Sequence, residues 1–484
     1  MASPLRQLEL FAVDLDDTSD DDDAFSSSSS RAPTVGSSRA SVASVDNVKN
    51  REKKRRTPLS PREQESQPHL TSDARTFANT IIAFLGSGML GLPFAFRQCG
   101  ILLGLATLVF VAAVSTYAML LVVQCKYKLR EQGRRVTTYG EIGHIAAGRV
   151  GGLLVDCSLV VSQSSFCIAY LIFIASNAHK FLEVPRELVV AVCAPPLVAF
   201  SLLKHMRELA FVALLADVMV LLGLAVVLWK DLAYMELNQS RVEALGALSS
   251  VPFFFGVATY CFEGVGMVLP LENSMQHKRN FTPILVSTVV IVTAIYATFG
   301  ICGYLAFGDA TQDVITLNID GSDGLATIVK LFLCAGLFFT HPVMLFPVFE
   351  VLKPLVRVKS GQRGRREGRE GSLDRSSGTV EGPVGDQVDE TKSALLRATV
   401  VLITALIAAG VPNFGRFIAF IGSTCCALLG FVLPALFYLR IYEADAPLSG
   451  QRVPWLKKAL LYVIMLIGAL VFGAGVYDAI ASMF

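Results

Sequence analysis

The pattern of apolar and polar positions divides the chain into a polar N-terminal tail, eleven apolar runs and one long polar loop. The apolar runs cover about 75–97, 101–125, 150–178, 187–203, 208–229, 247–271, 283–307, 324–352, 394–411, 415–439 and 456–481. A helix needs roughly 17–25 apolar residues to cross a bilayer, and each run supplies them. The pattern therefore predicts an all-α polytopic membrane protein with 11 transmembrane helices.

Two segments lack the apolar residues that a packed core needs. Residues 1–72 carry an acidic block followed by a basic cluster, and residues 353–392 are rich in Gly and Arg. Chains of such composition stay disordered. We therefore expect a disordered cytoplasmic tail over 1–72, spans 1–8 over 73–352, a disordered basic cytoplasmic loop over 353–392, and spans 9–11 over 393–484.

Composition and charge agree with a membrane protein and orient it. Hydrophobic residues make up 53% of the chain and charged residues only 17%, against roughly 25% charged in soluble domains. With a cytoplasmic N-terminus, the inner loops hold 23 Lys and Arg and the outer loops hold 6. Because cytoplasmic loops carry the excess of Lys and Arg, we predict a cytoplasmic N-terminus and a lumenal C-terminus.

The first span has a sequence that disfavours a continuous helix. Its segment LGSGMLGLP (85–93) contains three glycines and a proline, and an interior Gly costs roughly 1 kcal/mol and Pro about 3. Span 6 echoes it with GMVLP (266–270) and enters the membrane from the opposite side. Paired interrupted helices indicate an inverted five-plus-five repeat with a binding site at the breaks. The alternative is that the glycines only permit close helix packing.

Several segments resemble the amino acid/auxin permease family, closest to its branch of vacuolar neutral and proton-coupled amino-acid transporters. They are FAN (77–79), LGSGMLGLPFAF (85–96), SQSSFCIAYLIFI (162–174) and FEGVGMVLPLEN (262–273). The resemblance covers about 75–352 well and the last three spans loosely. It implies a LeuT-like fold of ten core helices plus one C-terminal helix, carrying amino acids with protons. Its motifs specify the family and not the substrate.

An amino-acid substrate would need one site for its carboxylate and one for its ammonium group at mid-membrane. We assign the carboxylate to backbone N–H groups of Gly86, Ser87 and Gly88, because Gly permits close approach and the following half-helix presents its positive end. Tyr170 either adds its hydroxyl to this site or packs with the hydroxyl bonded to a neighbouring helix. The ammonium group would meet carbonyls freed in span 6 near Thr259, Tyr260 and Phe262.

Carboxylates at membrane depth are the candidates for proton coupling, since burying one costs about 2.5 to 3.5 kcal/mol at a helix centre. Asp217 in span 5 is the stronger candidate, because folds like the one implied place an ion there. Glu263, at the predicted break of span 6, either exchanges a proton or accepts N–H bonds from the unwound backbone. Thr340 and His341 in span 8 present a similar choice, and a lone His is more often a bonded core residue.

The sequence contains no Walker A loop, zinc-protease motif or nucleophile elbow, so no enzyme is predicted. Its ten cysteines nearly all lie in apolar runs without metal-ligand spacing. We expect no cofactor, no metal and no nucleic-acid partner, and without a nucleotide fold a coupled gradient must drive transport.

The sequence therefore favours a secondary transporter of neutral L-amino acids, surrounded by membrane lipid and working by alternating access. A proton gradient is the predicted driving force, and sodium is the other ion left open. A vacuolar or lysosomal membrane is favoured over the plasma membrane. Two alternatives stay open. One is a carrier of another small anion such as auxin, and the other is an amino-acid sensor whose N-terminal tail binds a cytosolic partner.

Overall fold

The computed structural model describes residues 71–202, 206–237, 242–319, 324–356, 390–450 and 452–481. Except at their ends, the predicted tail over 1–72 and the predicted loop over 353–392 lie outside the described residues. Regular structure in the described part is helical, apart from an isolated parallel bridge between Thr71 and Met275. The predicted all-α class is confirmed.

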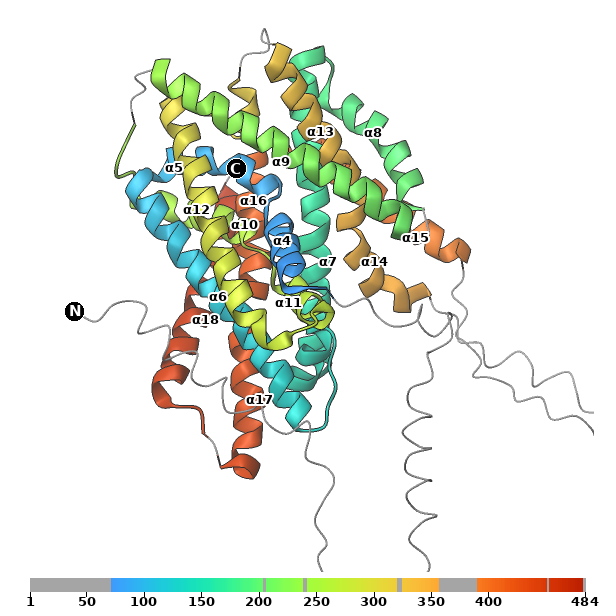
Figure 1. The fold of residues 1–484 in the computed structure, drawn as a ribbon, viewed down its shortest axis with the longest axis vertical. Helices are drawn as coiled ribbons and strands as arrows, with labels where there is room; N and C mark the ends of the chain where they lie inside the picture. The colour runs from blue at the N-terminus through green and yellow to red at the C-terminus, as the bar shows by residue number, and fades with distance from the viewer. Residues whose placement is uncertain are drawn as a thin grey trace, which may run out of the picture. The chain divides into compact units, whose positions relative to one another are not determined.

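Helices succeed one another along the described chain, and several cross the bundle at steep angles to their neighbours (Figure 1). In order they are α4 (Asp73–Phe84), η2 (Ser87–Gly91), α5 (Leu92–Cys99), α6 (Ile101–Glu131), α7 (Tyr139–Leu182), α8 (Arg186–Ser201), α9 (Met206–Leu237), η3 (Leu248–Ser250), α10 (Val251–Cys261), α11 (Val265–Ser274), η4 (Lys278–Asn280), α12 (Phe281–Phe307), η5 (Gly308–Ala310), η6 (Ile315–Leu317), α13 (Gly324–Met344), α14 (Phe346–Leu352), η7 (Lys353–Val356), α15 (Glu390–Gly410), α16 (Phe414–Ile421), the π-helical turns η8 (Gly422–Cys426) and η9 (Leu428–Val432), α17 (Leu433–Ser449) and α18 (Trp455–Ala481).

Within the described residues, nine helices are long and apolar enough to cross a bilayer. A tenth crossing results when α4 and the helix Ser87–Cys99, which are bent by 42° at the break between them, count as one span. The predicted span 187–203 coincides with α8, whose 16 residues rise about 24 Å against a hydrocarbon core of roughly 30 Å. The structure therefore supports nine or ten crossings, and the count of eleven stays a prediction.

Helices extend further into the predicted loop 126–149 than the apolar pattern indicates. α6 extends into this loop as far as Glu131. α7 begins within it at Tyr139, with a capping box formed by Thr138 and Glu141. Polar residues at these helix ends hide them from a hydropathy pattern, because the ends reach beyond the hydrocarbon. α7 kinks at Gly148, whose φ of 66° suits glycine, and the long membrane helix follows that kink.

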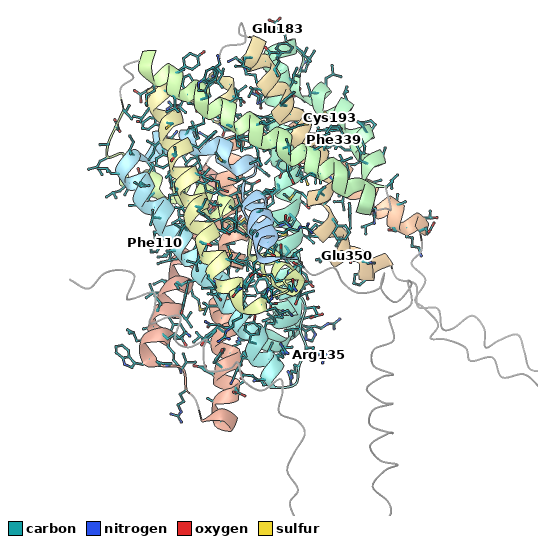
Figure 2. The ribbon with its side chains drawn as sticks, in the orientation of Figure 1. Phe110, Arg135, Glu183, Cys193, Phe339 and Glu350 are labelled. Atoms are coloured by element: carbon teal, nitrogen blue, oxygen red, sulfur yellow. The ribbon has the colours of Figure 1, made fainter. Side chains whose placement is uncertain are left out.

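Apolar side chains fill the interior and also cover the outside of the bundle. Phe96 of α5 and Phe254 of α10 are both fully buried and pack edge to face with ring centroids 5.0 Å apart. Phe110, by contrast, is 43% exposed on α6, and Figure 2 shows it at the periphery, with Arg135 and Glu183 near opposite ends of α7. This distribution fits a lipid-facing surface, because lipid solvates exposed apolar side chains.

Candidate functional site

The interruption predicted in span 1 is present and lies at Leu85 and Gly86. α4 ends at Phe84, and the next two residues leave the helical region, with φ/ψ of −76°/82° and −125°/−166°. The chain restarts as a tight turn at Ser87 and continues as α5. The first N–H groups of a helix have no partner inside it, so this restart presents backbone donors at mid-span.

The interruption predicted in span 6 is present as well. α10 ends at Cys261 and α11 begins at Val265. Between them Gly264 adopts φ/ψ of −154°/0°, and the Glu263 N–H donates to the Tyr260 carbonyl at 3.3 Å, three residues back instead of four. Both broken helices therefore expose peptide groups that a continuous helix would pair internally.

The two breaks border one cavity of about 540 Å³, within the size range of small-molecule sites. Helices α7, α9, α12 and α13 supply its other walls, together with the start of α14. Of the eleven site residues predicted from the sequence, seven line it: Gly86, Gly88, Tyr170, Asp217, Tyr260, Glu263 and Thr340. The sequence thus identified residues from five separate spans that the fold brings together.

The two lining glycines have different surroundings. A Cβ on Gly88 would lie 2.9 Å from the Cys261 Sγ and 3.0 Å from a Tyr260 ring carbon, so Gly88 lets the two broken spans approach closely. For Gly86, the nearest atom to such a Cβ is the Tyr170 hydroxyl at 4.0 Å, so space is left on that side. The two alternatives for this motif therefore apply to different glycines: close helix packing describes Gly88, and an open site describes Gly86.

Two of the predicted residues, Ser87 and Thr259, lie next to the breaks but are not in the cavity wall. Ser87 is fully buried, and its hydroxyl has no hydrogen-bond partner among the described residues. The Thr259 hydroxyl donates to the Phe255 carbonyl at 2.8 Å, one turn back along α10. Such back-bonding satisfies the hydroxyl within its own helix, and Thr259 is not part of the cavity wall.

Phe262 and His341 also lie outside the cavity wall. Phe262 is buried and packs edge to face on Tyr296, with ring centroids 5.3 Å apart. His341 is 1% exposed, and neither ring nitrogen has a hydrogen-bond partner among the described residues. The wall contributed by α13 uses Thr340, Val343 and Met344, which share a helix face that the intervening His341 does not join.

The electrostatics of the cavity come from two carboxylates. Asp217 on α9 and Glu263 at the break are both half-buried and line its wall. The Ser162 hydroxyl lies 3.5 Å from the Glu263 Oε1. Lys and Arg are absent from the described residues of the lining. The only groups available there to an anion are therefore N–H, O–H and amide donors, whereas a cation meets two acids.

Three polar lining residues were missed from the sequence: Asn79, Gln163 and Tyr296. Tyr296 of α12 is fully buried, and its hydroxyl donates to the Phe84 carbonyl and to the Cys261 carbonyl, the latter at 3.2 Å. The available signal was a tyrosine near the middle of the run 283–307, which also contains Tyr304 and several Ser and Thr. That signal is weak, because a buried tyrosine commonly packs as an aromatic.

Comparison with known proteins identifies relatives along almost the whole described chain. The profile of the family described as "Transmembrane amino acid transporter protein" matches residues 69–481. Amino acid transporter AVT3B from Arabidopsis thaliana is 34% identical, covering 86% of this chain and 94% of the relative. Proton-coupled amino acid transporter-like protein pathetic from Drosophila melanogaster is 27% identical, covering 84% of each chain. Vacuolar amino acid transporter 3 from Saccharomyces cerevisiae is 27% identical, covering 84% of this chain and 56% of the relative.

Among solved structures, the inward-facing conformation of Mhp1 is similar, with a TM-score of 0.55 and 13% identity over 88% of this chain and 95% of that one. Identity at this level speaks for the fold alone. The likeness supports the LeuT-like fold that the sequence predicts.

Proposed function

Because the chain belongs to the transmembrane amino acid transporter family, we propose that it carries neutral L-amino acids across an organelle membrane by alternating access, driven by protons. The chain is a transporter and not an enzyme, and its substrate class is a small-molecule amino acid. Which amino acid it carries, which ion drives it and how it cycles are the proposed parts.

One observation carries the proposal: both broken helices open on the same cavity, which has donors at one position and acids at another. The substrate carboxylate would bind the N–H groups at Gly86, Ser87 and Gly88, where the restarting helix presents its positive end. The ammonium group would lie toward Asp217 and Glu263. A zwitterion matches both ends, whereas a simple anion such as auxin leaves the two acids without a cation.

The preference for neutral side chains follows from the rest of the wall. Ile82, Phe166 and Met344 give it an apolar surface, which favours an apolar substrate side chain. An acidic side chain would face two carboxylates without a Lys or Arg among the described lining residues. Burying an unpaired charge is costly, so acidic amino acids should be poor substrates.

The cavity also indicates a conformational state. Its wall includes Asn79 and Ala83 of α4, Leu214 of α9 and Pro347 of α14, which all lie on the predicted cytoplasmic side of the breaks. On the other side, a Cβ on Gly91 would lie 2.6 Å from the Ile418 Cδ1, so packing closes that route. We interpret this as the inward-open state, with the predicted cytoplasmic N-terminus as its premise.

Proton coupling rests on the two lining acids and on the printed name of the Drosophila relative. Asp217 is the preferred proton carrier, because Glu263 already has the Ser162 hydroxyl beside it and unwound backbone around it. Thr340 has its hydroxyl bonded to the Gly336 carbonyl at 2.9 Å and is a wall residue rather than a proton carrier. The membrane is vacuolar, as for the yeast relative.

The test is uptake of labelled alanine into proteoliposomes, with and without an imposed pH gradient and with sodium present or absent. We expect the pH gradient to raise uptake and sodium to leave it unchanged. Equal uptake with and without the gradient contradicts proton coupling. Failure to transport any member of a panel of neutral amino acids contradicts the proposed substrate class.

The sensor alternative depends on the tail over 1–72, which lies outside the described residues except at its end, so this alternative stays a prediction. Deletion of residues 1–70 separates the two functions. A transporter without the tail keeps most of its uptake. A sensor shows no net uptake with or without the tail. After the deletion it keeps amino-acid binding and loses its cytosolic partner.

A further inference from the structure

The first helix of each broken span ends beside the same side chain, Tyr296 of α12. Phe84 is the last residue of α4 and Cys261 is the last residue of α10. In a continuous helix their carbonyls would accept the N–H groups of Gly88 and Val265, four residues on. The breaks remove both of these helical partners, and the Phe84 carbonyl instead accepts the Gly86 N–H at 2.9 Å. Both carbonyls are reached from α12.

One hydroxyl reaches both carbonyls and shares its single proton between them. The Tyr296 hydroxyl of α12 donates to the Phe84 carbonyl and to the Cys261 carbonyl. Its ring is held edge to face by Phe262, the residue that follows α10, with centroids 5.3 Å apart. Helix C-terminal ends carry partial negative charge, so a shared donor offsets the repulsion between two such ends placed together.

We propose that Tyr296 is a positioning residue, whose hydroxyl joins the ends of α4 and α10 and thereby fixes where the peptide groups of both breaks point into the cavity. Without the hydroxyl, the Phe84 carbonyl keeps only the Gly86 N–H. The buried Cys261 carbonyl loses the Tyr296 donor and regains one only if the backbone turns. The segments that would turn are Leu85–Gly88 and Phe262–Gly264, which border the substrate. The effect on substrate rests on the proposed function, and the effect on the backbone does not.

The experiment compares Tyr296→Phe with Tyr304→Phe in proteoliposomes. Tyr304 lies two turns further along α12, is also fully buried, and accepts a bond from the Glu243 N–H at 3.0 Å, far from either break. We expect Tyr296→Phe to raise the KM for alanine about tenfold and to change the maximal rate less than twofold. Tyr304→Phe should leave the KM within twofold of the parent protein.

A second measurement does not require transport. Hydrogen–deuterium exchange of the full chain in lipid nanodiscs should be faster in the peptides that contain 85–88 and 262–264 for Tyr296→Phe than for either the parent or Tyr304→Phe. If the parent carries no amino acid, the proposed function fails, while this exchange result still supports or overturns the role of Tyr296.

Three outcomes would overturn the inference: unchanged exchange at both breaks, an unchanged KM in a parent that transports, or equal effects of Tyr296→Phe and Tyr304→Phe. Should Tyr296→Phe not fold, Phe262→Leu is the second variant. It keeps the Tyr296 hydroxyl and removes the aromatic ring that packs against the Tyr296 ring. It should raise the KM and the exchange at the breaks in the same direction by a smaller factor. A lower melting temperature with unchanged KM and exchange would leave Tyr296 with a packing role only, which contradicts the proposal.

Discussion

The two broken spans are packed differently on the two sides of their breaks. On one side of the breaks, five of the eight residues of α5 and eight of the eleven of α10 are buried. On the other side, only three of the twelve residues of α4 and four of the ten of α11 are buried. In each of these two spans, one half (α5 or α10) is therefore mostly buried, and the other half (α4 or α11) is mostly not.

The two halves are also held by different forces. α5 and α10 pack through aromatic rings, and a Cβ on Gly256 of α10 would lie 2.3 Å from the Ala419 carbonyl. The segment just before α4 is joined to the end of α11 by polar bonds, such as that from the Thr71 N–H to the Ser274 carbonyl at 2.8 Å. Apolar packing resists displacement over its whole area, whereas a few polar bonds can break and re-form. This difference suits α4 and α11 to move while α5 and α10 stay in place.

The largest effect is expected from disturbing the firmly packed half. Gly256→Val places a branched side chain where the Ala419 carbonyl backbone already lies, and backbone cannot yield as a side-chain end can. We expect no folded protein, measured as loss of the monodisperse peak in size-exclusion chromatography in detergent. Gly473→Val is the control, because nothing lies within 4 Å of a Cβ at that position of α18. A folded Gly256→Val protein would contradict the view that this half is rigid.

The next effect comes from a buried ion pair at the far end of α11. Lys126 of α6 and Glu272 of α11 are 8% and 0% exposed and form a salt bridge. Lys126→Met leaves the buried Glu272 without its cation, with the Tyr127 hydroxyl still donating to it at 2.9 Å, and breaking such a pair costs about 3–5 kcal/mol of stability. The double variant Lys126→Met/Glu272→Met removes both charges and should recover most of that loss. The check is unfolding in denaturing detergent, and a double variant as unstable as the single one would count against this pairing.

The sequence predicted the breaks because their cause is local: glycines and a proline within an apolar run weaken a helix whatever surrounds it. It also placed seven residues at the cavity, since the inverted repeat and the span order fix which segments meet. The directions of Thr259 and His341 depend on helix rotation against neighbours that no local pattern records. Tyr296 was missed for the same reason, because its two acceptors are 212 and 35 residues away.

Uptake should be most sensitive at the glycine where the two broken spans touch. Gly88→Leu forces a large side chain against the Cys261 Sγ and the Tyr260 ring, 2.9 and 3.0 Å from the added Cβ. Overpacking of this kind costs about 1–3 kcal/mol, so the protein should stay folded. Uptake of labelled alanine should nevertheless be abolished, because the spans can no longer close on the substrate. Near-normal uptake would show that the breaks do not form the site.

The two lining acids differ in their proposed part in proton coupling. Asp217→Asn keeps the size of the side chain and removes its exchangeable proton, so uptake should become equal with and without a pH gradient. Glu263→Gln should keep the stimulation by the gradient, because that residue serves the break and its Ser162 contact. The measurement is the ratio of the two uptake rates for each variant. The reverse result, with the ratio lost only in Glu263→Gln, would transfer the coupling role to the break.

The smallest change concerns the open side of the same glycine motif. Gly86→Ala adds a methyl group that meets only the Tyr170 hydroxyl, at 4.0 Å, and its φ of −125° suits any residue. The fold and the helix break should therefore be unaffected, with a melting temperature equal to that of the parent. The methyl group occupies space proposed for the substrate carboxylate, so the KM for alanine should rise about fivefold, or ~1 kcal/mol. Gly133→Ala, at an exposed turn away from the cavity, is the control for the KM alone, since its φ of 75° makes some loss of stability expected there. An unchanged KM in Gly86→Ala would place the carboxylate at Gly88 or beyond, on the side where the two spans already touch.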